Sequence, residues 1–259
     1  MSSEVLVRDE AGVRLITLHR PESKNALTVE VNAQVRSAVE SAPGAVRVVA
    51  LTGAGGAFSS GLDLRVAAAE VLDPSAFEDR MRTHFHGLVR ALRACPLPTV
   101  AVVDGVAAGF GCDLALACDL RLCSDRARFG EIFVKRGLMP DGGGTWTLPR
   151  LVGLGRALEL MLTGRMVEAA EAEAIGLATR VFAADQLEAA ATDFLRSLAA
   201  GPPLVHRAVK AAVYRALHAS FDEALDTEAQ GQLQLLASRD FREGVLAFLE
   251  KRTPAFIGE

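Results

Sequence analysis

The chain lacks the segments that would hold it in a membrane or carry it through one. No run reaches the roughly 18 uncharged apolar residues that a membrane-spanning helix needs. The first ten residues are polar and acidic, without the basic start and apolar core of a secretory signal peptide. From these two absences we expect a soluble protein with no membrane partner.

Basic residues are not in excess either. The formal net charge is −4 and the isoelectric point is near 5.8, so the basic face that nonspecific nucleic-acid binding requires is not expected. We therefore predict no nucleic-acid partner, and any polyanionic ligand must find local cations. The 259 residues allow one or two domains, and the 50% apolar content supports a substantial core.

Cysteine is scarce and has no metal-binding or paired spacing. The four cysteines lie in or beside apolar segments without a Cys-x-x-Cys pair, and they are Cys95, Cys112, Cys118 and Cys123. We expect buried free thiols and a reducing, cytoplasmic location. His84 and His86 are close in sequence, but no helical His-x-x-x-His pair occurs, so we predict no metal site.

The common nucleotide and nucleophile motifs are also absent. The loop at 53–58 lacks the third glycine of a dinucleotide fingerprint, no Walker lysine follows a glycine-rich loop, and no Gly-x-Ser-x-Gly elbow occurs. These absences exclude the usual sequence signatures of nucleotide-dependent and serine-hydrolase chemistry. We predict no cofactor other than what a substrate brings with it.

Glycine is present where it matters, in two loops that each follow an apolar strand. Residues 105–114 follow the predicted strand Thr99–Val103, and residues 53–64 follow the predicted strand Val46–Leu51. Glycine permits the unusual dihedral angles and close backbone approach that such loops need. Two backbone N–H groups that converge on one carbonyl oxygen form an oxyanion hole, and a helix starting near Phe110 adds its positive dipole end. Ordinary surface turns are the alternative for either loop alone.

Hydrophobic periodicity divides the chain into a β/α part and a helical part. Before Gly153 it predicts strands at Val13–His19, Val46–Leu51, Thr99–Val103 and Leu120–Cys123, and helices at Thr28–Ser41 with Thr28 as N-cap, Pro74–Arg93 and Gly109–Cys118. Beyond Gly153 it predicts helices at Gly155–Leu162, Val167–Ile175, Asp185–Ala199, Pro203–His218, Phe221–Ala237 and Phe241–Lys251, interrupted only by a strand at Thr179–Phe182. The pattern therefore indicates an α/β fold with a helical C-terminal part.

A third stretch identifies a family. Residues 129–146 (FGEIFVKRGLMPDGGGTW), together with 20–27 (RPESKNAL), 162–165 (LTGR) and 173–177 (EAIGL), resemble the crotonase superfamily of enoyl-CoA hydratases and isomerases. The resemblance runs from about Val13 to Gly258. It implies a spiral of ββα units over residues 1–200 that carries the acyl-CoA site. It also implies a C-terminal helical region over residues 201–259 that forms a homotrimer or a dimer of trimers.

The resemblance assigns roles to the two glycine loops. It places the oxyanion hole on the backbone N–H groups of Leu62 and Phe110. Hydratases of the family use two glutamates to hold water; here the first position is Asp113 and the second is Phe133. A phenyl ring neither takes a proton nor orients water, so this chain departs from the hydratase pattern.

Asp141 stands eight residues beyond Phe133, where some isomerases and other thioester-processing relatives place a catalytic aspartate. The segments 140–146 and 148–150 particularly resemble the ring-opening isomerases of phenylacetate breakdown. Two simpler interpretations stay open: Asp141 as the N-cap of the following helix, and Asp113 as a structural residue. We predict Asp141 and Asp113 as catalytic residues.

The resemblance also implies a binding site for the coenzyme A part of the substrate. Its candidate residues are Lys24, Ala26, Leu27, Ser60, Gly61, Arg65, Lys251 and Phe256, the last two in a tail that completes the site in relatives, sometimes from a neighbouring subunit. Surface solvation is the alternative for the basic residues. We expect Phe133, Trp146 and the variable stretch Val66–Phe85 to line the acyl pocket.

These predictions favour one function and leave two others open. The leading hypothesis is an enzyme that isomerises or hydrates an enoyl-CoA thioester through an oxyanion-stabilised enolate, without metal or redox cofactor, with isomerisation slightly favoured. The second keeps the site but uses Asp141 for another thioester reaction, such as ring opening, C–C bond closure or dehalogenation. The third is a catalytically weak acyl-CoA-binding protein, because Phe133 replaces an acid.

Overall fold

A computed structural model describes residues 3–67 and 74–259. Its strands are β1 (Val5–Glu10), β2 (Val13–Leu18), β3 (Val48–Gly53), β4 (Thr99–Val103), β5 (Val106–Ala108), β6 (Leu120–Ser124), β7 (Arg128–Gly130), β8 (Val167–Glu168) and β9 (Arg180–Phe182). Its α-helices are α1 (Val29–Glu40), α2 (Leu64–Ala67), α3 (Pro74–Arg80), α4 (His86–Ala94), α5 (Phe110–Ala117), α6 (Gly144–Val152), α7 (Leu154–Thr163), α8 (Ala169–Ala174), α9 (Leu187–Ala200), α10 (Pro203–Ala216), α11 (Phe221–Leu236) and α12 (Arg239–Glu250). Short 3₁₀ helices cover Pro21–Ser23 and Ile132–Arg136, and a π-helix covers Met81–Phe85.

Two sheets form the core, and the predicted α/β class is confirmed. The larger sheet has the order β1-β2-β3-β4-β6-β9, in which only the β1–β2 pair is antiparallel. A smaller sheet has the order β5-β7-β8. The periodicity missed β1, β5 and β7, and β8 begins the stretch that was predicted to be wholly helical. Their lengths explain this, because β5, β7 and β8 have two or three residues and β1 is an exposed edge strand.

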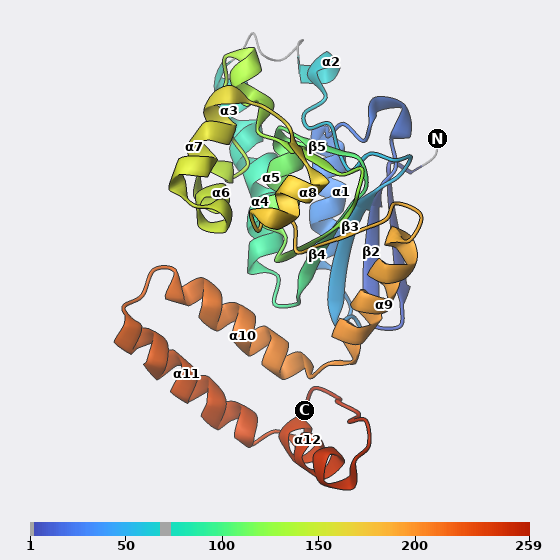
Figure 1. The fold of residues 1–259 in the computed structure, drawn as a ribbon, viewed down its shortest axis with the longest axis vertical. Helices are drawn as coiled ribbons and strands as arrows, with labels where there is room; N and C mark the ends of the chain where they lie inside the picture. Colours follow the sequence, from blue (N-terminus) through green and yellow to red (C-terminus); the bar gives the residue numbers. More distant parts are fainter. Residues whose placement is uncertain (1–2, 68–73) are drawn as a thin grey trace.

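Alternating side chains in the central strands build two apolar layers. Val49 and Leu51 of β3 face the cluster formed with α1, α4 and α5. Val48 and Ala50 face the opposite cluster, which α9 covers with Leu187, Ala191, Leu195 and Ala199 (Figure 1). Helices on both faces are the usual partners of a parallel sheet. This arrangement directs the ends of β3 and β4 into the two glycine loops.

Local signals placed the first helix correctly. The Thr28 hydroxyl accepts a hydrogen bond from the Val31 N–H at 3.2 Å, as predicted for the N-cap of α1. The helix predicted over 74–93 is instead divided into α3, the π-helix and α4. The structure describes all four cysteines, and they are buried free thiols as expected.

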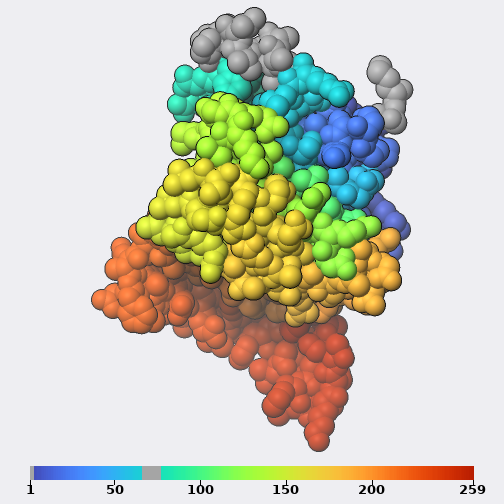
Figure 2. Space-filling model, turned by 45° about the horizontal axis from the view of Figure 1, so that its top comes forward, coloured from blue at the N-terminus to red at the C-terminus, as the bar shows by residue number. Residues whose placement is uncertain are grey.

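The C-terminal helices form a separate lobe (Figures 1 and 2). α10 and α11 run antiparallel below the core, and α12 lies beyond them at the end of the long axis. Neither α10 nor α11 has a buried residue. The exposed large apolar side chains of the two helices and of the C-cap of α10 are Val209, Val213, Leu217, Phe221, Leu225, Leu233 and Leu236. In the part of the chain that the structure describes, no helix is long and apolar enough to cross a membrane.

Candidate active site

A cavity of about 560 Å³ lies where the two glycine loops meet. Leu62 of the first loop and Phe110 of the second line it, together with Phe133 and Asp141. Its remaining wall is mostly apolar and includes Leu64, Phe77, Met81, Phe85, Ile132, Leu138 and Met139. The cavity therefore brings a small number of polar groups into an apolar space, as ligand pockets commonly do.

The first loop leaves one N–H without a partner. Leu27 pairs with the residues on either side of Leu62: its N–H donates to the Gly61 carbonyl at 2.8 Å, and its carbonyl accepts from the Asp63 N–H at 3.0 Å. The pairing does not involve the Leu62 N–H. This N–H donates a hydrogen bond to no group among residues 3–67 and 74–259. Gly61 has φ +89°, which lets the chain turn at this point.

The second loop provides a similar N–H at the start of a helix. Phe110 is the first residue of α5, so its N–H has no partner within the helix. No other described group accepts a hydrogen bond from it. The loops are in close contact, because a Cβ added to Gly61 would lie 3.2 Å from the Phe110 nitrogen. Two free N–H groups of one cavity wall are the donors that a developing oxyanion needs.

Asp141 is the acid of the cavity wall. Burial raises the pKa of its carboxyl to about 6, and Oδ1 is buried with no hydrogen-bond donor among the described residues. The helix-cap interpretation of Asp141 is wrong, because α6 begins at Gly144 with Gly143 at its N-cap and no side chain of the described part caps it. Asp141 is half-buried and lines the cavity, so its carboxyl is available to a ligand there.

Asp113 lies behind this wall. Its side chain is 1% exposed and is absent from the described residues that line the cavity. Oδ2 accepts a hydrogen bond from the Gly142 N–H at 2.8 Å. Burial, and next the neighbouring charge of Glu131, hold the pKa of Asp113 well above its ordinary value. Asp113 therefore contacts the loop that carries Asp141 on the side away from the cavity.

Glu131 and His86 were not among the site residues predicted from the sequence. Glu131 is 3% exposed, and burial raises its pKa to about 7. His86, at the start of α4, lies 2.8 Å from the Asp141 carbonyl oxygen through Nε2. The available signal for Glu131 was a carboxylate between apolar residues at the end of a short strand. No sequence pattern connects His86 to a residue 55 positions away.

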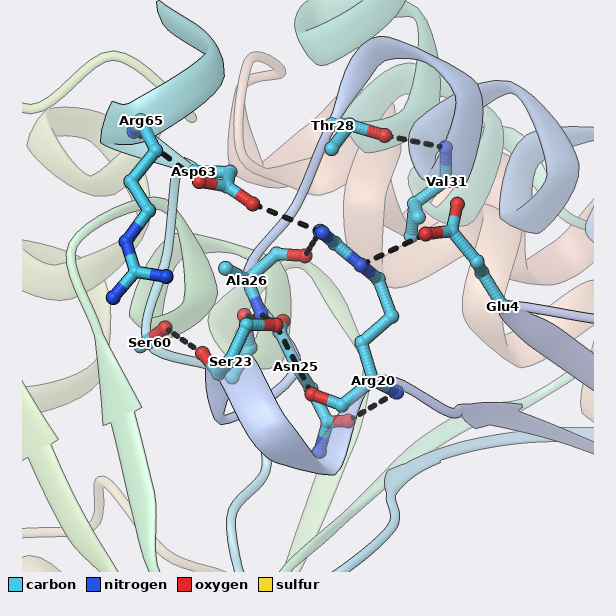
Figure 3. Close-up of polar contacts among 11 residues, drawn as sticks. Glu4, Arg20, Ser23, Asn25, Ala26, Thr28, Val31, Ser60, Asp63 and Arg65 are labelled. Carbon is cyan, nitrogen blue, oxygen red and sulfur yellow. Dashed lines mark hydrogen bonds and ion pairs between the residues drawn. The ribbon is translucent and has the colours of Figure 1, made fainter. Parts of the chain in front are cut away.

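Three of the predicted coenzyme A contacts from the N-terminal half, Ala26, Ser60 and Arg65, lie close together (Figure 3). The Ser60 N–H donates to the Lys24 carbonyl at 2.9 Å, which joins residues 24–27 to residues 60–62. Arg20 secures this junction by donating to the Ala26 carbonyl at 2.7 Å and to Asp63 at 3.0 Å. Lys24, Ala26, Leu27, Ser60, Gly61 and Arg65 thus lie beside the cavity.

Three other predicted site residues lie elsewhere. Trp146 was expected in the acyl pocket, but it lines a different cavity of about 530 Å³ between α6 and α10. There its ring lies between Arg93 and Arg150, whose guanidinium carbons are 4.1 and 3.9 Å from its centroid. Lys251 and Phe256 belong to the C-terminal lobe, at the opposite end of the long axis from α2 (Figure 1).

The predicted acyl-pocket stretch at 66–85 is only partly described. Residues 68–73 lie outside the described residues. From the rest of the stretch, Phe77, Met81 and Phe85 line the cavity. Phe85 also packs edge-on against Phe110, with ring centroids 4.9 Å apart. The described part of the stretch thus contributes apolar surface next to the second glycine loop.

Comparisons with known proteins identify the family. A family model described as enoyl-CoA hydratase/isomerase matches residues 8–259. The chain is 42% identical over 247 residues to a protein of Rhodobacter capsulatus named probable enoyl-CoA hydratase, covering 95% of each. It is 37% identical over 262 residues to the 1,2-epoxyphenylacetyl-CoA isomerase of Escherichia coli, covering 100% of each.

A solved structure matches the fold equally well. The crystal structure of enoyl-CoA hydratase from Bacillus anthracis superposes with a TM-score of 0.94 at 32% identity, covering 99% of this chain and 100% of that one. The match extends over the spiral core and the C-terminal helices together. The chain therefore belongs to the enoyl-CoA hydratase/isomerase family of the crotonase superfamily and is an enzyme of that family, as its motifs predicted.

Proposed function

We propose that this enzyme moves the double bond of an enoyl-CoA thioester through an enolate. The observation that supports this most is one carboxylate, Asp141, in an apolar cavity that also presents the N–H groups of Leu62 and Phe110. Hydrogen bonds from both groups to the thioester oxygen make the α-carbon more acidic. Each donor of this kind contributes roughly 3–4 kcal/mol to stabilising the developing oxyanion.

One carboxylate is sufficient for a 1,3-proton shift. In our proposal ionised Asp141 removes a proton from C2 of a 3-enoyl thioester, and the electron pair moves through the C1–C2 bond to the oxygen. The resulting neutral carboxyl then returns the proton to C4, which forms the 2-enoyl product. Its raised pKa of about 6 lets it accept and release a proton near neutral pH. The chemistry as proposed requires neither a metal nor a redox cofactor.

Hydration is the less favoured reaction of the same site. Addition of water across the double bond ordinarily uses two carboxylates, and Phe133 supplies an apolar ring to the cavity instead of the second. A further thioester reaction has independent support. The Escherichia coli relative named 1,2-epoxyphenylacetyl-CoA isomerase makes ring opening with Asp141 the second candidate. Binding of acyl-CoA without turnover is the third.

The C-terminal lobe supports a proposed homotrimer, or a dimer of trimers. Helices α10 and α11 leave a row of apolar side chains exposed, and Phe248 of α12 is 82% exposed. Apolar surface of this extent is typical of a subunit interface. In such an assembly Lys251 and Phe256 would reach the site of a neighbour. The free buried thiols support a cytoplasmic location, and the thioester chemistry supports a role in fatty acid metabolism.

A substrate panel tests the proposed function. Purified enzyme is incubated with straight-chain, branched and aromatic 2-enoyl-CoA and 3-enoyl-CoA thioesters and with 1,2-epoxyphenylacetyl-CoA, and products are located by mass spectrometry and NMR. We expect conversion of 3-enoyl to 2-enoyl thioesters to exceed hydration. Tight binding with no turnover of any thioester would favour the binding-protein hypothesis.

A further inference from the structure

The peptide group between Asp141 and Gly142 is held from both sides. Its carbonyl oxygen lies 2.8 Å from His86 Nε2, and its N–H donates to Asp113 Oδ2 at 2.8 Å. A carbonyl oxygen only accepts, so His86 Nε2 carries the hydrogen. Because a peptide group is planar, holding both its ends fixes the plane from which the Asp141 side chain departs.

Two glycines make this contact possible. A Cβ at Gly142 would lie 2.5 Å from the Asp113 Cβ and 2.8 Å from the Phe110 ring. A Cβ at Gly144 would lie 2.2 Å from Asp113 Oδ1 and 3.2 Å from Glu131 Oε1. The loop therefore rests directly on the Asp113 side chain. The same distances show that Asp113 and Glu131 approach each other beneath the loop.

The Cys112 thiol and the Asp113 carboxyl are the hydrogen-bonding side chains beside Glu131 in the described part of the chain. Both oxygens of Glu131, and Asp113 Oδ1, are buried without a hydrogen-bond donor among the described residues. The other groups around Glu131 are the Asp141 carboxyl and Arg165, which borders the same internal cavity of about 10 Å³ but pairs with two exposed glutamates. Two carboxyl groups in this position satisfy each other when they share a proton.

The electrostatics of the pair agree with this arrangement. Burial is the main cause that raises the pKa of both groups. Asp113 Oδ2 accepts from the Gly142 N–H, which leaves Oδ1 as the oxygen that can share a proton with Glu131. Neither residue is among the described residues that line the cavity.

We propose that Asp113 and Glu131 share one proton and that, with His86, they are positioning residues that hold Asp141 toward the thioester. Asp113 takes no proton from the substrate in this arrangement. The inference rests on the proposed function of Asp141. It adds Glu131 and His86 to the reaction, and it gives Asp113 a role different from the acid that the motif position implied.

Paired variants of Asp113 test the role directly. Asparagine can accept from the Gly142 N–H and donate to Glu131, so Asp113→Asn preserves both bonds, whereas Asp113→Ala removes them. With 3-hexenoyl-CoA as substrate, we expect Asp113→Asn to keep kcat within about 3-fold and Asp113→Ala to lower it by about 30-fold or more with little change in KM. Equal losses in both variants would overturn the proposal, because Asp113 would then transfer a proton itself.

His86 offers a second pair of the same design. Glutamine can present an amide N–H close to the position of Nε2, so His86→Gln should retain more of kcat than His86→Ala. A merely structural role would lower stability without this selective rescue of kcat. If both variants keep full activity, His86 does not position Asp141.

Hydrogen–deuterium exchange separates this inference from the proposed function. The rate is followed by mass spectrometry in a peptide that contains Gly142, and no substrate is needed. We expect faster exchange in Asp113→Ala and wild-type exchange in Asp113→Asn. Unchanged exchange in Asp113→Ala would refute the positioning contact. If exchange changes as expected but wild-type enzyme converts no thioester, the proposed function fails while the contact stands.

Discussion

The wall of the cavity and the layer directly beneath it differ in whether a ligand can reach their polar groups. In the wall, the N–H groups of Leu62 and Phe110 and Oδ1 of Asp141 have no partner among the described residues. In the layer beneath, Asp113 Oδ2 accepts from the Gly142 N–H, while Asp113 Oδ1 and both Glu131 oxygens have no donor among the described residues and, in our inference, share a proton. An unpaired buried polar group costs about 1–3 kcal/mol, which a ligand can offset in the wall but not below it.

The groups that meet the substrate and the groups that position them are therefore different residues that lie next to one another in space. The groups of the wall are free because a substrate can supply their partners. No ligand reaches the groups below, so in our inference the shared proton is what pairs them. Variants of the wall should therefore change turnover, and variants of the buried layer should change stability and the placement of Asp141.

The largest expected effect is in the wall. Asp141→Asn removes the only carboxylate among the described residues that line the cavity but leaves its shape unchanged. We expect kcat for 3-hexenoyl-CoA isomerisation to fall by roughly 10²–10⁴ while thioester binding stays within about 3-fold, measured by steady-state kinetics and calorimetry. Asp185→Asn, at an exposed position before α9, is the matched control. Full activity of Asp141→Asn would remove the proposed mechanism.

The next effect concerns charge in the buried layer. A folded-state pKa of about 7 for Glu131, raised from 4.5, means that folding favours its protonated form. Its contribution to the unfolding free energy is therefore complete below about pH 4.5 and is lost as pH rises to about 7. Glu131→Gln cannot ionise, so we expect it to be more stable than wild type at about pH 8, by up to about 3 kcal/mol.

Urea unfolding across this pH range measures the difference. Glu188→Gln, at an exposed position of α9, serves as the control and should follow the wild-type curve. If Glu131→Gln follows the wild-type curve as well, Glu131 does not titrate in the folded protein as described.

A glycine substitution tests the contact between the cavity wall and the buried layer. Gly142→Ala places a Cβ 2.5 Å from the Asp113 Cβ, so we expect the unfolding free energy to fall by about 1–3 kcal/mol and kcat to fall with it. Gly155→Ala in α7 meets no atom within 4 Å and should be neutral or stabilising by up to about 1 kcal/mol. Similar thermal unfolding of the two variants would contradict the close contact between the loop and Asp113.

The smallest expected effect is at Arg65, one of the predicted coenzyme A contacts beside the cavity. Arg65 is exposed beside Ser60, and in our proposal it contacts a phosphate of coenzyme A. We expect Arg65→Ala to raise KM by about 2- to 5-fold at low salt with kcat unchanged, and the difference to shrink as salt screens the charge. Arg8→Ala, on the exposed edge strand β1, is the control. A KM that does not respond to either variant would exclude Arg65 from the phosphate site.

Local patterns predicted most of the large elements. The strands at Thr99–Val103 and Leu120–Cys123 and the Thr28 cap of α1 follow from short-range rules, because burial on both faces and capping depend on adjacent residues. The short strands β5, β7 and β8 have no such signal, since two or three residues do not establish an alternation. They exist because they pair with one another in the smaller sheet, which brings together distant parts of the chain.

The site divides in the same way. Residue identity at fixed spacing was enough to predict the family, the glycine loops at Leu62 and Phe110, and the replacement of an acid by Phe133. The folded structure was needed to find that Asp141 lines the cavity, that Asp113 lies beneath it with Glu131 and His86, and that Trp146 belongs to another cavity. These contacts join residues far apart in the chain, such as His86 and Asp141 at 55 positions, and the direction of a side chain in space is set by packing rather than by spacing along the chain.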